Sequence, residues 1–211
     1  MRTLPVLAML SAFVLSACGG KVDYVRPTSD PKIQNTKVVP GAKEAVWNKT
    51  IPALGKQFFV INNLDKSSGL VNLSYSGDPE KYVDCGEISS YVSNVRGKRT
   101  YNFPAARASQ EYEVMNSEGL FVIDRKMALE GRMNLIFEDA GPSQTRVTAN
   151  TRYVLTRSQR VQGGGGPSRE RTDTMSFNTG QVGSLPVPNS AETVDCVSTG
   201  RLEAEVLALV Q

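Results

Sequence analysis

The sequence contains no histidine, the side chain that most often serves as a general base near neutral pH. Its absence excludes Ser-His-Asp triads and most transition-metal sites. The remaining option is carboxylate chemistry, and the one dense acidic cluster consists of Asp78, Glu80, Asp84 and Glu87. Such spacing is common on solvated loops and lacks the glycine turn and regular oxygen ligands of a calcium loop. We therefore expect a protein that is not an enzyme, with no catalytic residues, no metal and no cofactor.

Long apolar runs are also missing, and the longest one lies near the amino terminus, between Leu4 and Val14. This run is too short to cross a bilayer as a helix. It follows Arg2 and leads into Leu15-Ser16-Ala17-Cys18-Gly19. A basic start, a short apolar region and small residues after it are typical of an export signal.

Residues 15–18 resemble the lipobox of bacterial lipoprotein signals. The resemblance implies that residues 1–17 are a signal peptide, that Cys18 is lipidated on its thiol, and that its new amine receives an acyl chain such as palmitate. Two or three acyl chains make such an anchor effectively permanent. Gly19 in place of aspartate implies, by resemblance to Gram-negative sorting rules, an outer-membrane lipoprotein facing the periplasm. The alternative is an ordinary secretory signal in which Cys18 is incidental.

Cysteine is scarce, and only Cys85 and Cys196 follow Cys18. Exported thiols meet an oxidising compartment, and each of these two cysteines ends a Val-Asp-Cys tripeptide. We predict a disulfide between them, with two separate buried thiols as the alternative.

Blocks of one charge sign are absent, because the 24 basic and 21 acidic residues are interleaved. This pattern excludes a nucleic-acid-binding surface. The richest basic stretch, Arg96-Gly97-Lys98-Arg99, could contact anionic lipid or glycan, but we interpret it as a solvated loop.

Apolar periodicity is missing between residues 18 and 40, where glycine, proline and small polar residues prevail. We interpret this segment as a flexible tether. Residues 41–211 are long enough for one domain with a substantial core, and we predict a single periplasmic domain there.

Within that domain, helical spacing predicts a helix between Gly41 and Lys56, shortened by Pro52, and a second helix after Gly200. We expect Glu203 and Glu205 on the polar face of the second helix. Alternation and β-branched residues predict strands at 57–62, 70–75, 98–103, 127–138, 145–161 and 174–178.

The strands at 127–138 and 145–161 form the strongest predicted pair, a long antiparallel hairpin. We expect its solvated face to carry Arg146, Arg152, Arg157 and Arg160. The predicted fold class is α+β, with an antiparallel sheet packed by an N-terminal and a C-terminal helix, as in helix-grip folds.

Three segments carry a further resemblance: Val46-Trp47 through Leu54, then Phe58 to Asn62, then Gly69 to Tyr75. In its residue types this pattern resembles a repeat of the NlpB family, the C lipoprotein of the outer-membrane β-barrel assembly machinery. The resemblance covers residues 42–75. It implies a helix-grip architecture and a non-enzymatic periplasmic accessory role.

The leading hypothesis is a lipid-anchored outer-membrane accessory protein that binds another envelope protein in assembly or integrity of the envelope. The alternative is a binding module for a lipid or another hydrophobic ligand. The possible ligand or partner surface consists of Trp47, Phe59, Leu73 and Leu135. A hydrolase that uses the acidic cluster is the third class.

Overall fold

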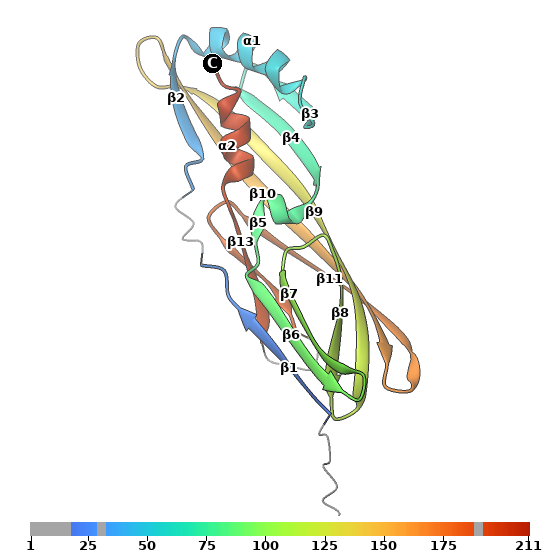
Figure 1. Cartoon of the computed structure of the whole chain (residues 1–211). Helices are drawn as coiled ribbons and strands as arrows, with labels where there is room; N and C mark the ends of the chain where they lie inside the picture. Colours follow the sequence, from blue (N-terminus) through green and yellow to red (C-terminus); the bar gives the residue numbers. More distant parts are fainter. Residues whose placement is uncertain (1–17, 29–32, 188–191) are drawn as a thin grey trace, which may run out of the picture.

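The computed structural model describes residues 18–28, 33–187 and 192–211, so the predicted signal peptide lies outside the described residues. The molecule is elongated, with two short helices near one end and several strand turns at the other (Figure 1). The helices are α1 (Lys43–Leu54) and α2 (Arg201–Ala208), with a single 3-10 turn, η1 (Pro79–Lys81).

Strands make up most of the described chain. They are β1 (Gly19–Val25), β2 (Thr36–Pro40), β3 (Val60–Asp65), β4 (Leu70–Gly77), β5 (Val83–Asp84), β6 (Glu87–Asn94), β7 (Gly97–Pro104), β8 (Ser109–Asn116), β9 (Gly119–Asp139), β10 (Gln144–Gly163), β11 (Gly166–Asn178), β12 (Val182–Pro186) and β13 (Thr193–Ser198).

The expected α+β helix-grip fold is wrong, because 63% of the described residues are in strands and only 12% are helical. The described strands form three antiparallel sheets. The predicted pair at 127–138 and 145–161 lies within a longer hairpin of β9 and β10, with 21 and 20 residues, and includes its turn end. The two helices cover only part of this hairpin, and further strands cover the rest.

The β9–β10 hairpin runs the length of the molecule and belongs to a seven-stranded sheet (Figure 1). Towards the helices, β9 pairs with β4 and β10 pairs with β2. Towards the other end, β9 pairs with β8 and β10 pairs with β11. We call the first part, with α1, α2 and β2–β4, the helical half. The second part, with β1, β5–β8 and β11–β13, is the strand half.

In the helical half, α1 and α2 pack on the inner face of the sheet. Residues at helical spacing on α1 are buried, and the Trp47 ring meets the Phe137 ring edge-on with centroids 5.1 Å apart. Pro52 lies in the last turn of the helix, where it has no N–H to donate to the Asn48 carbonyl, and the helix ends two residues later at Leu54. The predicted positions of both helices are therefore confirmed, although their share of the fold is not.

The expectation for Glu203 is wrong, since its side chain is fully buried beneath α2. The hydroxyl of Tyr153 shares its one proton between the two carboxylate oxygens of Glu203, at 2.8 and 2.7 Å, and the Thr179 hydroxyl donates to Oε1 at 2.7 Å. These hydrogen bonds join α2 to the sheet, and they give the buried carboxylate of Glu203 its hydrogen-bond donors.

In the strand half, two small sheets cover the long hairpin. Their strand orders are β1-β6-β7 and β12-β13-β5. The predicted disulfide is confirmed, because Cys85 and Cys196 are bonded across a sequence separation of 111 residues. It joins the connection between β5 and β6 to β13, next to the short β5–β13 pairing.

The segment that we interpreted as a tether contains β1 and β2. β1 pairs with β6 from Gly19 opposite Ser93 to Val25 opposite Glu87, and β2 pairs with the start of β10. The Tyr24 side chain also bonds the backbone of Asp195, accepting from its N–H at 2.9 Å. Each pairing depends on a partner far away in the sequence, which local composition does not reveal.

Candidate functional site

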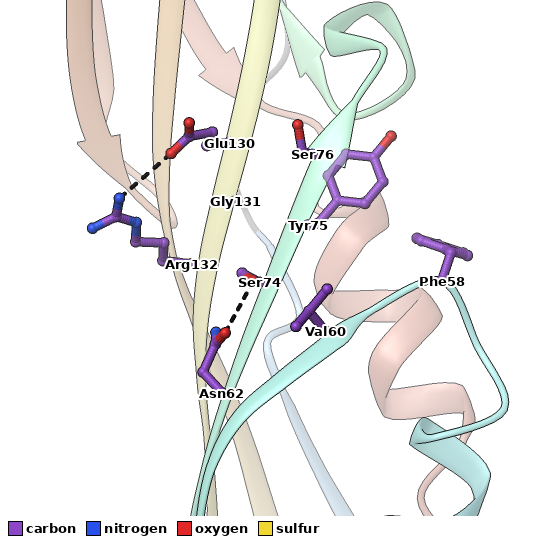
Figure 2. A pocket seen from close by; sticks show the side chains of 9 residues that line it. All are labelled: Phe58, Val60, Asn62, Ser74, Tyr75, Ser76, Glu130, Gly131 and Arg132. Carbon is purple, nitrogen blue, oxygen red and sulfur yellow. Dashed lines mark hydrogen bonds and ion pairs between the residues drawn. The ribbon is translucent and has the colours of Figure 1, made fainter.

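An open groove of about 540 Å³ lies on the helical half, where β3, β4 and β9 run side by side. Figure 2 shows Glu130 and Arg132 on the β9 side and Phe58 and Val60 on the β3 side, with β4 between them. The remaining lining residues are Asn62, Ser74, Tyr75, Ser76 and Gly131.

The groove arises because β3 is shorter than its neighbour. β3 is the last strand at its edge of the sheet, and its pairing begins with Val60 opposite Ser74. β4 continues to Gly77, so its residues from Tyr75 onward pair with β9 but with no other described strand. Both β3 and the end of β4 therefore present an open backbone edge within the described residues.

A bulge in β3 shapes the middle of this edge. The register shifts between Ile61, opposite Leu73, and Asn63, opposite Asn72, which leaves Asn62 as the extra residue. The Asn62 side chain turns towards β4, where the Ser74 hydroxyl donates to its Oδ1 at 3.4 Å (Figure 2).

Apolar side chains along the edge are unusually accessible. Phe58 is 51% exposed, Val60 is 60% exposed and Leu64 is 46% exposed. They extend over a short stretch of one chain segment, in contrast to the single exposed apolar residues that are normal on protein surfaces. The edge therefore combines free backbone groups with apolar side chains.

An aromatic cluster holds Phe58 at one end of the groove. The Phe58 and Tyr75 rings meet edge-on with centroids 5.5 Å apart, and Tyr75 meets Tyr82 at 4.8 Å. The Lys81 ammonium lies 5.2 Å from the centroid of Phe58 and 4.9 Å from that of Tyr82. Cation–π contacts at these distances restrain the Phe58 ring despite its exposure.

Hydrogen bonds join this cluster to α2. The Tyr82 hydroxyl donates to Glu205 Oε2 at 2.8 Å, and Arg201 Nε donates to Glu205 Oε1 at 2.9 Å. Burial alone would raise the pKa of Glu205, but these bonds and the Lys81 charge outweigh burial and lower it. Burial and the neighbouring Glu205 raise the pKa of Tyr82, which keeps this phenol protonated.

The β9 side of the groove is polar. Arg132 and Glu130 form an exposed ion pair at 3.4 Å (Figure 2). Between them, Gly131 lies against α2, since a Cβ there would come within 2.9 Å of Leu202 Cδ2. A glycine at this position lets α2 pack closely on the sheet beneath the groove.

The four residues predicted as a ligand or partner surface lie together in the core of the helical half. Trp47, Phe59, Leu73 and Leu135 are 6%, 8%, 2% and 0% exposed. None of the four lines the groove, although the Phe59 ring contacts the Phe58 ring with centroids 4.4 Å apart. The accessible apolar residues are Phe58 and Val60, on either side of Phe59 in the sequence. Because all three residues are apolar, the sequence does not show which of them are exposed.

The residues of the acidic cluster have separate local roles. Asp78 accepts a hydrogen bond from the Glu80 N–H at 3.0 Å at the start of η1, and Asp84 accepts one from the Gly86 N–H at 2.8 Å. Glu80 pairs with Arg107 at 3.6 Å, and Glu87 is exposed on β6. Among the described residues, no three acidic or thiol side chains are grouped as metal ligands.

Cys18 is an exposed free thiol directly before β1. No helix within the described ranges has the length and apolar character needed to cross a membrane.

Two functional candidates were missed in the sequence, namely Arg125 and Arg157. The prediction that Arg157 points outward is wrong, since it is 3% exposed, and Arg125 is 1% exposed. Strand parity could have found both. Leu129 and Leu155 occupy odd-numbered core positions of their strands, and Arg125 and Arg157 have the same parity.

Comparisons of the chain with protein-family models, with curated proteins and with solved structures find no match.

Proposed function

We propose that this protein is a lipid-anchored accessory of the outer membrane, facing the periplasm, that binds an extended segment of another envelope protein. The binding site is the open edge of β3 together with the groove beside it. The observation that carries this proposal is an unpaired strand edge flanked by the exposed Phe58, Val60 and Leu64. No cofactor or metal is required.

The anchor in this proposal is Cys18, because it ends a lipobox and is followed by the small residue Gly19. The thiol is exposed, so acyl chains on it can enter a bilayer without disturbing the domain. β1 begins at the next residue, so the lipid is attached directly to a strand of the domain.

The position of β1 then orients the molecule. Gly19 pairs with Ser93, next to the turn where Asn94 pairs with Gly97. The turn between β8 and β9 lies at the same end, since a Cβ on Gly20 would meet Met115. The strand half therefore faces the membrane, and the helical half points away from it (Figure 1).

The groove is far from this anchored end. Arg132 lies 13 residues along β9 from Gly119 at the turn, and at about 3.3 Å per residue this is about 40 Å. In this arrangement the domain itself is a stiff spacer that presents the β3 edge well above the bilayer surface.

Strand addition suits the open edge in two respects. The free N–H and C=O groups of an edge strand provide backbone hydrogen bonds to an added strand. Phe58 and Val60 provide apolar contacts on the groove side, where the Lys81 contact already restrains the Phe58 ring. A restrained aromatic side chain loses little conformational freedom on binding.

The anchor is tested by supplying cells with labelled palmitate and fractionating their membranes. We expect label on the wild-type chain in the outer membrane and none on Cys18→Ala. If the wild-type protein carries no label and is found in the soluble fraction, the proposal that Cys18 is lipidated is wrong.

The partner site is tested by crosslinking intact cells that carry the wild-type chain, Val60→Lys or Val182→Lys. Val182 is 59% exposed on β12 and serves as the matched control. We expect one envelope protein to be enriched with wild type and with Val182→Lys but lost with Val60→Lys. Equal enrichment with all three chains would show that the β3 edge is not the site.

A further inference from the structure

A second cavity lies in the strand half, where the three sheets meet. Its volume is about 220 Å³. Its walls come from β1, β6, β8, β9, β10 and β13, and from Val187 and Glu192 beside the last two short strands. Val22, Ile88 and Val194 provide apolar wall, and Tyr112 and Tyr24 provide aromatic wall. Val22 is 49% exposed and lies at the solvent side.

Two guanidinium groups enter this apolar interior. Arg125 donates to the backbone carbonyls of Ala105 and Arg107, and within the described chain it forms no ion pair. Burial and the nearby charge of Arg157 lower the pKa of Arg125, to about 10, although Tyr112 acts in the opposite direction. At neutral pH the side chain is therefore a buried cation with neutral partners.

Arg157 is only partly neutralised. Its Nη2 donates to Asp173 Oδ2 at 2.7 Å and to the Pro186 carbonyl at 2.6 Å. Its buried Nε has no hydrogen-bond partner among the described residues. Asp173 is shared, since its other oxygen pairs with Arg171. Glu192 also lines the cavity and has contacts of its own.

We propose that this cavity binds a small amphipathic anion, a medium-chain carboxylate whose head group meets Arg125 and Arg157. A guanidinium presents several N–H donors in a plane that matches a carboxylate, and such charged hydrogen bonds are strong in a dry interior. The apolar chain would lie along Val22, Ile88 and Val194. The unpaired charge of Arg125 is the feature that the ligand satisfies.

The size of the cavity limits the ligand. At ~30 Å³ per water-sized group, about 220 Å³ accommodates roughly seven such groups. This corresponds to a carboxylate of about six to eight carbons, with the solvent side near Val22 able to accept the end of a slightly longer chain. This cavity lies in the strand half, away from the β3 edge, so ligand binding here does not depend on the proposed partner.

The test is calorimetric titration of the mature chain carrying Cys18→Ser, which contains every described residue, with octanoate and with octanol. We expect octanoate to bind at one site per chain and at least tenfold more tightly than octanol, which has the same chain without the charge. Equal affinity for the two probes, or no octanoate binding, would overturn the proposal.

Two pairs of variants locate the site. Arg125→Met should weaken octanoate binding at least tenfold, and the exposed Arg152→Met should not change it. Because Arg125→Met alters the interior, Val22→Trp provides a second variant at the exposed side of the cavity, with Val182→Trp as its control. Octanoate binding that survives Val22→Trp and Arg125→Met unchanged would show that it occurs elsewhere.

Discussion

The two halves of the molecule share one hairpin but treat buried charge differently. In the helical half, the carboxylate of Glu203 is fully buried, and the hydroxyls of Tyr153 and Thr179 both donate to it. In the strand half, Arg125 and Arg157 are almost as deeply buried, but one lacks a described counter-ion and the other leaves Nε without a partner.

This difference separates two uses of a buried polar group. A satisfied group such as Glu203 joins two elements, and removing it leaves its donors unpaired. A group with unused donors beside a cavity is instead suited to bind something that the chain itself does not provide.

The largest effect is expected from the disulfide, which joins the connection between β5 and β6 to β13 in the strand half. In the chain-entropy model, closing a loop of about 100 residues contributes ~4.7 kcal/mol, and removing native disulfides typically costs about 2–5 kcal/mol. For a chain of this size, a loss of ~3 kcal/mol lowers the melting temperature by about 6–12 °C. Differential scanning calorimetry of the double variant Cys85→Ala with Cys196→Ala measures it.

Cys18→Ala is the matched control, because this thiol is exposed and unbonded. We expect its melting temperature to equal that of the unlipidated wild type. An equal and small change in both variants would mean that the sheets of the strand half hold together without the covalent link.

A smaller loss is expected from Glu203→Leu in the helical half. The substitution leaves the buried Tyr153 hydroxyl without its acceptor, and each unsatisfied buried donor costs about 1–3 kcal/mol. Urea denaturation should show a lower midpoint with an unchanged slope. A midpoint equal to that of wild type would contradict the role of Glu203 in fixing α2 to the sheet.

Arg125→Met sharpens the contrast, since we expect it to change the free energy of unfolding by less than about 1 kcal/mol. Replacing a buried charge by an apolar side chain removes a desolvation penalty, which offsets the lost bonds to two carbonyls. The same urea experiment measures it. A loss larger than that of Glu203→Leu would show that Arg125 serves the fold rather than a ligand.

The smallest effect is the pH dependence of the helical half. The pKa of Glu205 is lower in the folded chain than its ordinary value of 4.5, so its contribution is present above that value and is lost as the pH falls through the folded pKa. We therefore expect Glu205→Gln to lower the melting temperature at pH 6 but to match wild type more closely at pH 3.

Glu130→Gln provides the control for this prediction, because Glu130 is 59% exposed in a surface ion pair. Its melting temperature should follow that of wild type at both pH values. A constant difference between Glu205→Gln and wild type from pH 6 to pH 3 would rule out the Tyr82–Glu205 interaction as its cause.

The sequence allowed prediction of features that depend on local pattern. Alternation predicted the strands at 127–138 and 145–161, and helical spacing predicted the helix between Gly41 and Lys56. The disulfide could be predicted because an exported protein meets an oxidising compartment and only two cysteines follow Cys18. These features need little knowledge of which strands pair.

Features that depend on distant pairing were not predictable in this way. β1 and β2 are strands because β6 and β10 accept them, and their own composition is that of a linker. The open groove depends on where β3 ends relative to β4, which only the register reveals. Arg157 was assigned to solvent because of its charge, although the parity of β10 places it inside.

The most direct test of the account places a photo-crosslinking residue at either end of the lipidated protein in intact cells. One chain carries it at Val60 in the helical half, and the other at Val95, which is 87% exposed in the turn beside Cys18. We expect a discrete protein adduct from position 60 and a lipid adduct from position 95. A lipid adduct from position 60, or the same protein adduct from both positions, would contradict it.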